Sequence, residues 1–378
     1  MVASARLCPL DMLLPRGASS IMPKRLGVFL PNWIGDVVMA TPALRALRKL
    51  VGPSGQLVGV MRPHVAEVLA GTHWLDEIIL YSKDRKHPEL NRNTAQRQLR
   101  ALNLDCAVLF TNSLRTAWMA WRGGARERIG YVGDFRALLL TKRLKQIDRD
   151  SDDLPVPTID SYLRLAEAAG CAPESPHLEL ATRPEDERGA DALWKRFGLP
   201  DGNQVVVLNS GGAFGSTKHW PAEHFAKLAQ RIVAERGLSV LVHCGPAERD
   251  DAARIVALAG DHRIVGMSEL DRLPIGLAKA CVRRSRILVS TDSGLRFFGI
   301  AFGKPVVSLF GPTAPEATRT HYDRETCLSL SLDCQPCVER ACPLGHHRCM
   351  RDLSVDRVFA AVVSQLDNTI VGGRRIVA

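Results

Sequence analysis

The sequence predicts an α/β protein with two halves, each built on a parallel β-sheet covered by helices. The chain has 378 residues, more than one ordinary domain needs. Short apolar runs typical of buried strands alternate with amphipathic helical segments, a pattern that favours parallel sheets with helical crossovers. This alternation occurs twice, on either side of a segment rich in proline and charge.

The first half begins after Lys24. Four short, continuously apolar runs are predicted as buried strands, at residues 26–30, 56–61, 78–81 and 106–110. Between the first two strands, apolar residues at helical spacing predict one helix over 35–50. A second helical pattern, over 159–169, closes this half.

Three prolines between 173 and 184, together with the charged run 185–188, are interpreted as a linker. A second series of strand-like runs follows it, at 204–209, 239–244, 263–265, 286–290 and 305–310. Between these runs, 224–236 has helical periodicity. We therefore expect two Rossmann-like domains facing a central cleft, with ligands at the carboxyl ends of the strands.

The predicted boundaries divide the chain into four parts. They are a disordered N-terminal extension over 1–23, an N-terminal domain over 24–180, a C-terminal domain over 181–352, and a C-terminal helix and tail over 353–378. The extension holds a short apolar stretch interrupted by Pro9 and Pro15, unlike a signal peptide. We expect the working protein to begin near Met22 and to be cytoplasmic.

Composition excludes several classes of protein. Apolar residues make up 46% of the chain and charged residues 24%, values typical of folded globular proteins rather than disordered or fibrous ones. No apolar run approaches the roughly 20 residues that span a bilayer. Ten cysteines in a chain of this length do not indicate a secreted disulfide scaffold.

The net charge of +10 favours an anionic partner. Phosphorylated substrates and an acidic membrane surface are both compatible with it. Aromatic residues make up only 6% of the chain, and no base-stacking pattern interleaves with the basic residues. Nucleic acid is therefore not an expected partner.

The loop after the first predicted strand carries Asp36 beside Gly35. A carboxylate where a strand ends and a helix begins can serve as a general base in a cleft. It can equally cap the helix or stabilise its dipole. The sequence alone leaves both roles open.

Three loops of the second half are candidates for ligand binding. Residues 209–221 place Ser210, Gly211, Thr217 and Lys218 after a strand, where backbone N–H groups and an ammonium suit phosphate, although the spacing is not that of a P-loop. Residues 290–295 add hydroxyl and amide donors, and a carboxylate that can accept hydrogen bonds from sugar hydroxyls. Residues 310–313 end another strand. Any one of these loops can also be a plain connection.

A cysteine-rich segment follows the last predicted strand. Four thiols, two of them in a CxxC pair, can bind a structural zinc ion tetrahedrally, or they can be reduced thiols packed in a loop. These four residues are Cys334, Cys337, Cys342 and Cys349.

Four stretches of the chain together resemble a known family. They are LGVFLPNWIGDVVMATPALRALR, NSGGAFGSTKHWPAEHFAKLA, VSTDSGLRFFGIAFGKPVVSLFGPT and CQPCVERACPLGHHRCM, and they lie between residues 25 and 353. In order and spacing they resemble the ADP-heptose:lipopolysaccharide heptosyltransferases of glycosyltransferase family nine, above all the heptosyltransferase II branch. The resemblance implies a GT-B fold and an inverting, metal-independent transfer of heptose from ADP-heptose to the inner core of lipopolysaccharide.

The resemblance also implies roles for individual residues. Asp36 matches the family's proposed catalytic base, and Lys218 matches the lysine that contacts the donor phosphate. Glu248 is aligned more loosely with a glutamate that binds the ribose. The full donor-binding set is Ser210, Gly211, Thr217, Lys218, Glu248, Asp292, Ser293, Gly294 and Leu295.

An anionic glycolipid acceptor is implied for the N-terminal half, with peripheral contact to the cytoplasmic face of the inner membrane. Candidate partners for the acceptor's carboxylates and phosphates are Arg115, Arg122, Arg126, Arg128 and Arg136. One departure is Phe297, where members commonly carry a histidine. Two alternatives remain open beside heptose transfer: use of another nucleotide sugar for a different surface glycan, and a degenerate nucleotide-sugar-binding protein.

Overall fold

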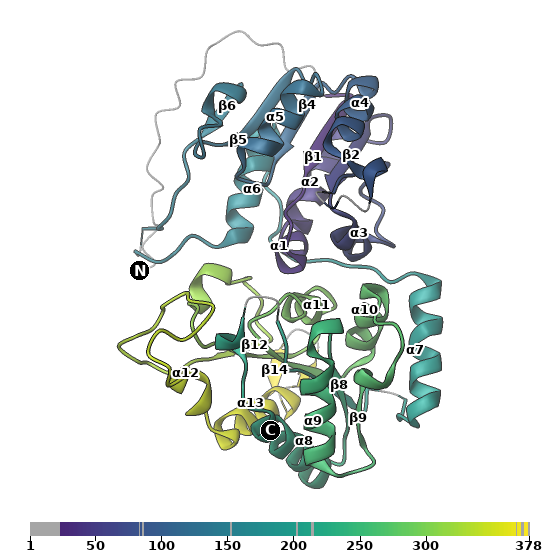
Figure 1. The fold of residues 1–378 in the computed structure, drawn as a ribbon, viewed down its shortest axis with the longest axis vertical. Coiled ribbons are helices and arrows are strands. Elements are labelled where there is room, and N and C mark those ends of the chain that lie inside the picture. Colours follow the sequence, from purple (N-terminus) through teal and green to yellow (C-terminus); the bar gives the residue numbers. More distant parts are fainter. Residues whose placement is uncertain are drawn as a thin grey trace.

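The computed structural model describes residues 23–82, 84, 87–151, 153–201, 203–212 and 215–367, together with the backbone of 369–371 and 374–376. Residues 1–22 of the predicted N-terminal extension lie outside the described residues, as does the proposed start at Met22. The described chain forms two α/β halves stacked one above the other (Figure 1).

The N-terminal half contains a six-stranded sheet of order β3-β2-β1-β4-β5-β6. Every pairing in it is parallel. Its strands are β1 (Arg25–Phe29), β2 (Gln56–Met61), β3 (Glu77–Leu80), β4 (Cys106–Leu109), β5 (Glu127–Tyr131) and β6 (Lys142–Leu144).

The C-terminal half repeats this design in the order β12-β11-β10-β7-β8-β9, again with parallel pairings. Its strands are β7 (Val205–Asn209), β8 (Ser239–His243), β9 (Ile264–Gly266), β10 (Ile287–Thr291), β11 (Val306–Leu309) and β12 (Glu325–Leu328). Two sheets of this kind confirm the predicted pair of Rossmann-like units. A short antiparallel pair, β13 (Thr369–Val371) and β14 (Arg374–Ile376), ends the chain.

Helices cover both faces of each sheet. In the first half they are α1 (Ile34–Met39), α2 (Thr41–Val51), α3 (Pro63–Leu69), α4 (Arg92–Leu102), α5 (Leu114–Arg122) and α6 (Thr158–Ala168), with 3-10 turns η1 (Pro88–Leu90) and η2 (Ala137–Leu139). In the second half they are α7 (Pro184–Phe197), α8 (Ala222–Arg236), α9 (Arg249–Ala259), α10 (Ile275–Arg284), α11 (Arg296–Ala301), α12 (Arg348–Arg351) and α13 (Val355–Asp367). The 3-10 turns there are η3 (Ser216–Lys218), η4 (Pro246–Glu248), η5 (Met267–Glu269) and η6 (Pro315–Thr318).

Alternation along the strands assigns side chains to the two faces of the first sheet. Val28 belongs to the core beneath α1, α2 and α6, whereas the neighbouring Phe29 belongs to the core beneath α4 and α5. The first of these cores continues without interruption into the C-terminal half. The two halves therefore pack directly on each other.

The structure differs from the sequence predictions in two helices. The single helix expected over 35–50 is divided at Ala40, because Pro42 has no N–H to donate to Val38. The Thr41 hydroxyl donates to that carbonyl instead, at 2.7 Å. The charged run 185–188, interpreted as linker, forms the first turns of α7, where its acidic residues complement the helix dipole.

Three strands of the two large sheets were missed, as was the short pair β13 and β14 in the predicted tail. β5 and β6 hold charged residues and a glycine among few apolar ones, and β6 is an exposed edge strand. β12 is the corresponding edge of the second sheet. Within the described residues, no helix is both long and apolar enough to cross a membrane.

Candidate functional site

The candidate site lies where the carboxyl ends of the two sheets face each other. α1 follows β1, and its first turn contacts the first turn of α11, which follows β10 in the other half. A Cβ placed on Gly35 would lie 2.8 Å from Cε2 of Phe297 and 3.4 Å from the Cα of Gly294. Only glycine allows the two halves to approach this closely.

Asp36 occupies the first turn of α1 at this contact. The residue before the helix is Trp33, which makes no side-chain cap bond. Burial raises the pKa of the Asp36 carboxyl from 3.8 to about 6. A carboxylate whose pKa lies this close to neutrality is suited to accept a proton from a hydroxyl group.

Three strand ends of the second half bring together the loops predicted to bind a donor. β10, β7 and β8 are neighbours in the sheet. From β7 the strand order continues to β8 and β9 on one side and to β10, β11 and β12 on the other, so β7 and β10 flank the switch point at which ligands of such sheets bind. The Asn209 amide donates to the Ser293 hydroxyl at 2.8 Å and to the Gly211 carbonyl at 3.2 Å, which joins two of these loops.

Glu248 and Ser210 also lie at these strand ends. A Cβ on Gly211 would lie 2.3 Å from Cγ of Glu248, so the glutamate packs directly against the glycine-rich loop. The Ser210 hydroxyl is buried and has no hydrogen-bond partner in the structure. A buried hydroxyl without a partner is costly, and a ligand that contacts this loop would supply one.

Lys218 makes a buried ion pair with Asp292. Its ammonium lies 2.5 Å from Oδ2 of Asp292 and 3.1 Å from the Asp292 carbonyl oxygen. The Thr313 hydroxyl donates to the same carboxylate at 2.7 Å. The loops that end β7, β10 and β11 thus converge on one carboxylate and one ammonium.

Arg296 is a cation of this region that sequence reasoning missed. It is fully buried, forms an ion pair with Glu325, and lies 3.7 Å from Asp292. Burial lowers its pKa, but the Glu325 and Asp292 charges outweigh that effect and raise the pKa overall. The signal was available, because an arginine within the apolar run of α11 requires a buried partner.

Two residues of the predicted donor-binding set have other neighbours. The Thr217 hydroxyl donates to the Glu339 carbonyl at 2.7 Å, and its side chain lines a cavity among the cysteines. The Leu295 side chain is packed in the apolar core. Because the side chains of Thr217 and Leu295 are already engaged, only their backbone groups can contact a ligand.

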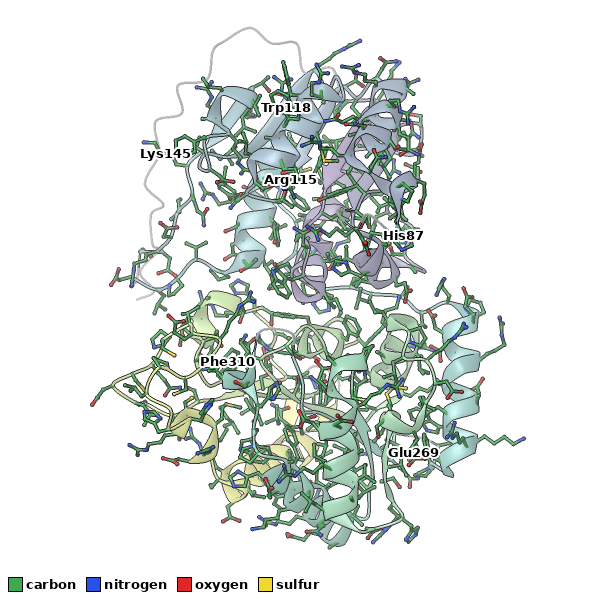
Figure 2. All side chains as sticks on the ribbon, in the orientation of Figure 1. His87, Arg115, Trp118, Lys145, Glu269 and Phe310 are labelled. Atoms are coloured by element: carbon green, nitrogen blue, oxygen red, sulfur yellow. The ribbon has the colours of Figure 1, made fainter. Side chains whose placement is uncertain are left out.

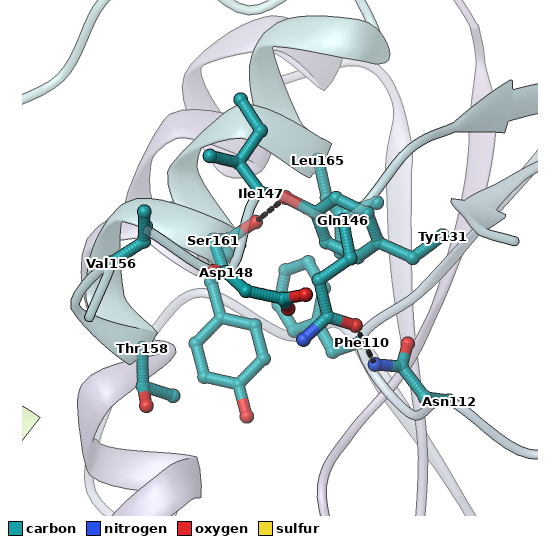
Figure 3. Close-up of a pocket in the computed structure, with 11 residues that line it drawn as sticks. Phe110, Asn112, Tyr131, Gln146, Ile147, Asp148, Val156, Thr158, Ser161 and Leu165 are labelled. Atoms are coloured by element: carbon teal, nitrogen blue, oxygen red, sulfur yellow. Dashed lines mark hydrogen bonds between the residues drawn. The ribbon is translucent and has the colours of Figure 1, made fainter. Parts of the chain in front are cut away.

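The N-terminal half contains a polar cavity of about 180 Å³ (Figure 3). Its wall combines aromatic side chains with amide, carboxylate and hydroxyl groups, contributed by Phe110, Asn112, Tyr131, Gln146, Ile147, Asp148, Val156, Thr158, Ser161, Tyr162 and Leu165. Burial raises the pKa of Tyr162 well above 10, and the nearby charge of Asp36 adds to this. The cavity was not predicted, because part of its wall comes from the end of β5 and from the segment after β6, and neither strand was recognised in the sequence.

Two of the five candidate acceptor arginines make hydrogen bonds within the protein. Arg136 is fully buried and donates to the carbonyls of Tyr131 and Thr111 and to the Asn112 side chain. Arg128 donates to the carbonyls of Leu139 and Ala125, each at 2.6 Å. Most of their guanidinium donors are thus used inside the protein, which argues against a role for these two arginines in acceptor binding. The three exposed arginines are Arg115, Arg122 and Arg126.

The four cysteines predicted to bind zinc line one small cavity, of about 20 Å³, with Thr217 and His346. Burial raises the pKa of Cys349, and the other three thiols raise it further. Among the described residues, no group of three or more His, Cys, Asp or Glu side chains is arranged to hold a metal ion. Zinc would require the four sulfurs to converge to about 2.3 Å from one point, so zinc binding stays a prediction.

Comparison with known proteins places this geometry in a family. The profile of glycosyltransferase family 9 (heptosyltransferase) matches residues 92–348. Lipopolysaccharide heptosyltransferase 2 of Escherichia coli K12 is 24% identical over 341 residues, which cover 87% of this chain and 94% of that protein.

Two solved structures share the fold. A family 9 glycosyl transferase from Veillonella parvula superimposes with a TM-score of 0.77 at 24% identity, covering 91% of this chain and 97% of that one. ADP-heptose lipopolysaccharide heptosyltransferase II of E. coli superimposes with a TM-score of 0.73 at 21% identity, covering 90% and 98%. The fold is therefore GT-B, and the chain belongs to glycosyltransferase family 9, the heptosyltransferase family.

Proposed function

We propose that this glycosyltransferase moves heptose from ADP-heptose to the inner core of lipopolysaccharide, at the cytoplasmic face of the inner membrane. The observation that carries the proposal is the contact between the Asp36 turn and the Gly294 loop, two residues from the Asp292 that binds Lys218. The lipopolysaccharide heptosyltransferases 2 of E. coli and Salmonella typhimurium, both 24% identical over most of the chain, support the choice of donor and acceptor.

In the proposed reaction, Asp36 takes the proton from an acceptor hydroxyl. The freed oxygen attacks the anomeric carbon from the face opposite to ADP, the bond from that carbon to the ADP oxygen breaks, and the configuration inverts. The burial that raises the pKa of Asp36 makes this carboxylate a stronger base than an exposed one.

Departing ADP carries developing negative charge, and Lys218 is the residue we propose to stabilise it. Its ammonium is already fixed by the Asp292 carboxylate and carbonyl, so it needs little reorganisation when the bond breaks. α11 is only six residues long and contributes a small dipole. We propose that Lys218 performs this task without a metal ion.

The acceptor sugar is proposed to enter the cavity of Figure 3. A cavity of about 150 Å³ holds a six-membered ring, and this one measures about 180 Å³. Aromatic faces with amide, carboxylate and hydroxyl groups suit a hydroxyl-rich ring. The charge of Asp36 acts on Tyr162 of the cavity wall, which supports an acceptor hydroxyl bound near the base.

The test is incubation of the purified protein with ADP-heptose and a heptose-deficient lipopolysaccharide acceptor. Transfer with release of ADP is the expected result. Transfer only from another nucleotide sugar would identify the alternative donor that Phe297 keeps open. Binding of ADP-heptose without any transfer would identify a degenerate binding protein.

A further inference from the structure

An exposed apolar face covers the outer side of the N-terminal half, away from the catalytic contact. On α5, Leu114, Trp118 and Trp121 are spaced so that they share one face of the helix. Trp118 and Trp121 are 41% and 43% exposed, and their ring centroids lie 4.9 Å apart. Large aromatic side chains gathered in this way on a surface usually mark an interaction site.

The turn η2 extends this face beside α5. Phe135 is 95% exposed and Leu138 is 88% exposed. The Leu114 backbone N–H donates to the Asp134 carboxylate at 3.2 Å, which fixes the η2 loop against the start of α5. We call Leu114, Trp118, Trp121, Phe135 and Leu138 the outer aromatic face.

Buried Arg136 holds this loop in place. Its guanidinium donates to the Tyr131 carbonyl at 2.7 Å and to the Asn112 side chain at 2.7 Å, and it also reaches the Thr111 carbonyl. The backbone of Phe135 is left-handed, with φ of 55°, an uncommon conformation for a bulky residue, and it lies in the loop that Arg136 anchors. The exposure of Phe135 and Leu138 is therefore built into the fold.

Basic residues outnumber acidic ones in the segment that carries the outer aromatic face, and the Arg122 guanidinium lies 5.9 Å from the centroid of the Trp121 ring. Between residues 114 and 145 the chain has eight basic and two acidic residues, within a protein whose net charge is +10. Six of the basic residues are exposed: Arg115, Arg122, Arg126, Lys142, Arg143 and Lys145. Lys142 donates to the Ala168 carbonyl on the α6 side of the sheet and Arg126 pairs with Asp105, so neither belongs to the outer aromatic face. By alternation along β6, Arg143 projects toward the α5 side. Figure 2 shows Arg115, Trp118 and Lys145 on this half.

We infer that the outer aromatic face docks on an anionic phospholipid bilayer. Tryptophan and phenylalanine rings insert at the level of the lipid headgroups, and surrounding arginine and lysine side chains pair with anionic headgroups. This combination fits a membrane surface better than a second copy of the chain, because two copies would bring the same positive charges together.

The position of the face suits an acceptor held in the membrane, a point that rests on the proposed function. The Asn112 amide that accepts from Arg136 also donates to Gln146 at 3.2 Å, at the wall of the cavity of Figure 3. Buried Arg136 thus links the docking loop to one residue of the cavity wall, Asn112. A glycolipid anchored in the bilayer would then meet the same half of the protein that contains the cavity.

The test is sedimentation of the full-length protein with vesicles of phosphatidylcholine, with and without phosphatidylglycerol, in the absence of donor and acceptor. We expect binding only to the vesicles with phosphatidylglycerol, and weaker binding as the salt concentration rises. The variant Trp118→Ser/Trp121→Ser should bind these vesicles about tenfold or more weakly, because it lacks two aromatic rings that would be buried in the bilayer on docking. Phe135→Ser, on a different element, should weaken binding as well.

Leu258→Ser is the matched control, since Leu258 is an exposed apolar residue of α9 in the other half. It should bind as the unmodified protein does. Equal binding by the aromatic variants and the unmodified protein would overturn the inference, as would no preference for phosphatidylglycerol. A dimer that Trp118→Ser/Trp121→Ser disrupts, without vesicle binding, would instead assign the face to a second copy of the chain.

Failure of docking and failure of the proposed reaction are distinguishable. Asp36→Asn should bind the vesicles as well as the unmodified protein, whether or not the chain transfers heptose. Trp118→Ser/Trp121→Ser should keep its activity on a water-soluble core oligosaccharide acceptor and lose it on an acceptor embedded in vesicles. Loss on both acceptors would contradict a docking role.

Discussion

Asp36 illustrates at the scale of one residue how a functional group can oppose stability. Burial raises the pKa of its carboxyl from 3.8 to about 6. Between these two pH values the folded chain binds a proton that the unfolded chain has lost, so the native state is relatively more stable below this window. Above pH 6, ionised Asp36 costs at most about 3 kcal/mol of unfolding free energy.

Asp36→Asn should therefore stabilise the protein at about pH 8, and this gain should disappear as the pH falls to about 4. Thermal unfolding of both proteins across this range measures the difference. A capping role for Asp36 predicts the reverse, a loss of stability wherever the carboxylate is ionised. With a base at this position, kcat/KM of the unmodified protein should also fall on the acid side with an apparent pKa of about 6.

Lys218 is the second residue whose role the structure makes testable. Lys218→Gln keeps an N–H donor for the buried Asp292 carboxylate but removes the positive charge. We expect ADP to bind at least about tenfold more weakly, with a matching loss of kcat, as for one charge-assisted phosphate contact. Calorimetric titration with ADP measures the first effect, and Lys227→Gln, on the exposed side of α8, is the control. Unchanged ADP affinity would remove Lys218 from the donor site.

At the scale of elements, continuous apolar runs made the central strands predictable, and their loops carried the motif residues. Hydrogen-bonding partners were not predictable in the same way. In the sequence, Arg136 and Arg128 look like arginines that bind an acceptor, yet in the structure their guanidinium groups donate to backbone carbonyls. The cavity of Figure 3 depends on β5 and β6, whose charged, partly exposed sequences conceal them.

The contact between α1 and α11 fixes how the N-terminal and C-terminal halves are positioned relative to each other. Gly35→Ala would place a methyl group 2.8 Å from the Phe297 ring and move the halves apart. We expect kcat to fall by about tenfold or more, because small displacements of reacting groups are costly. Gly35→Ala/Phe297→Leu should recover part of this loss by making room for the methyl group.

Gly189→Ala is the control for that pair, since its Cβ would meet nothing closer than 3.5 Å. It lies within α7, where alanine should stabilise the protein by about 0.5–1 kcal/mol. Steady-state kinetics and thermal unfolding of the three variants test the contact. Full activity of Gly35→Ala would show that the halves need not approach this closely.

The cysteine segment gives a second prediction at this scale. Protein purified without chelators should contain about one zinc ion per chain, bound by the four thiols. Replacing Cys337 with serine should release the metal and lower the thermal stability. Mass-spectrometric metal analysis measures the content. Metal-free protein with unchanged stability would leave the four thiols as packing residues of the loop.

At the scale of the whole molecule, the sequence supported two stacked α/β halves and a site at their facing edges. Repetition of the strand–helix pattern made the two sheets predictable, and strand ends of parallel sheets locate ligand sites. The direct packing of Gly35 on Gly294 was not predictable, because residues 259 positions apart carry no local signal of contact. The predicted domain boundaries at 180 and 352 stay predictions.

The most direct test of the account is heptose transfer by the unmodified protein and by Asp36→Asn, with ADP affinity measured on the same preparations. We expect the unmodified protein to transfer heptose from ADP-heptose to heptose-deficient lipopolysaccharide. Asp36→Asn should bind ADP nearly as well but turn over about a hundredfold or more slowly. Equal turnover by the two proteins, or no transfer by the unmodified one, would contradict the account.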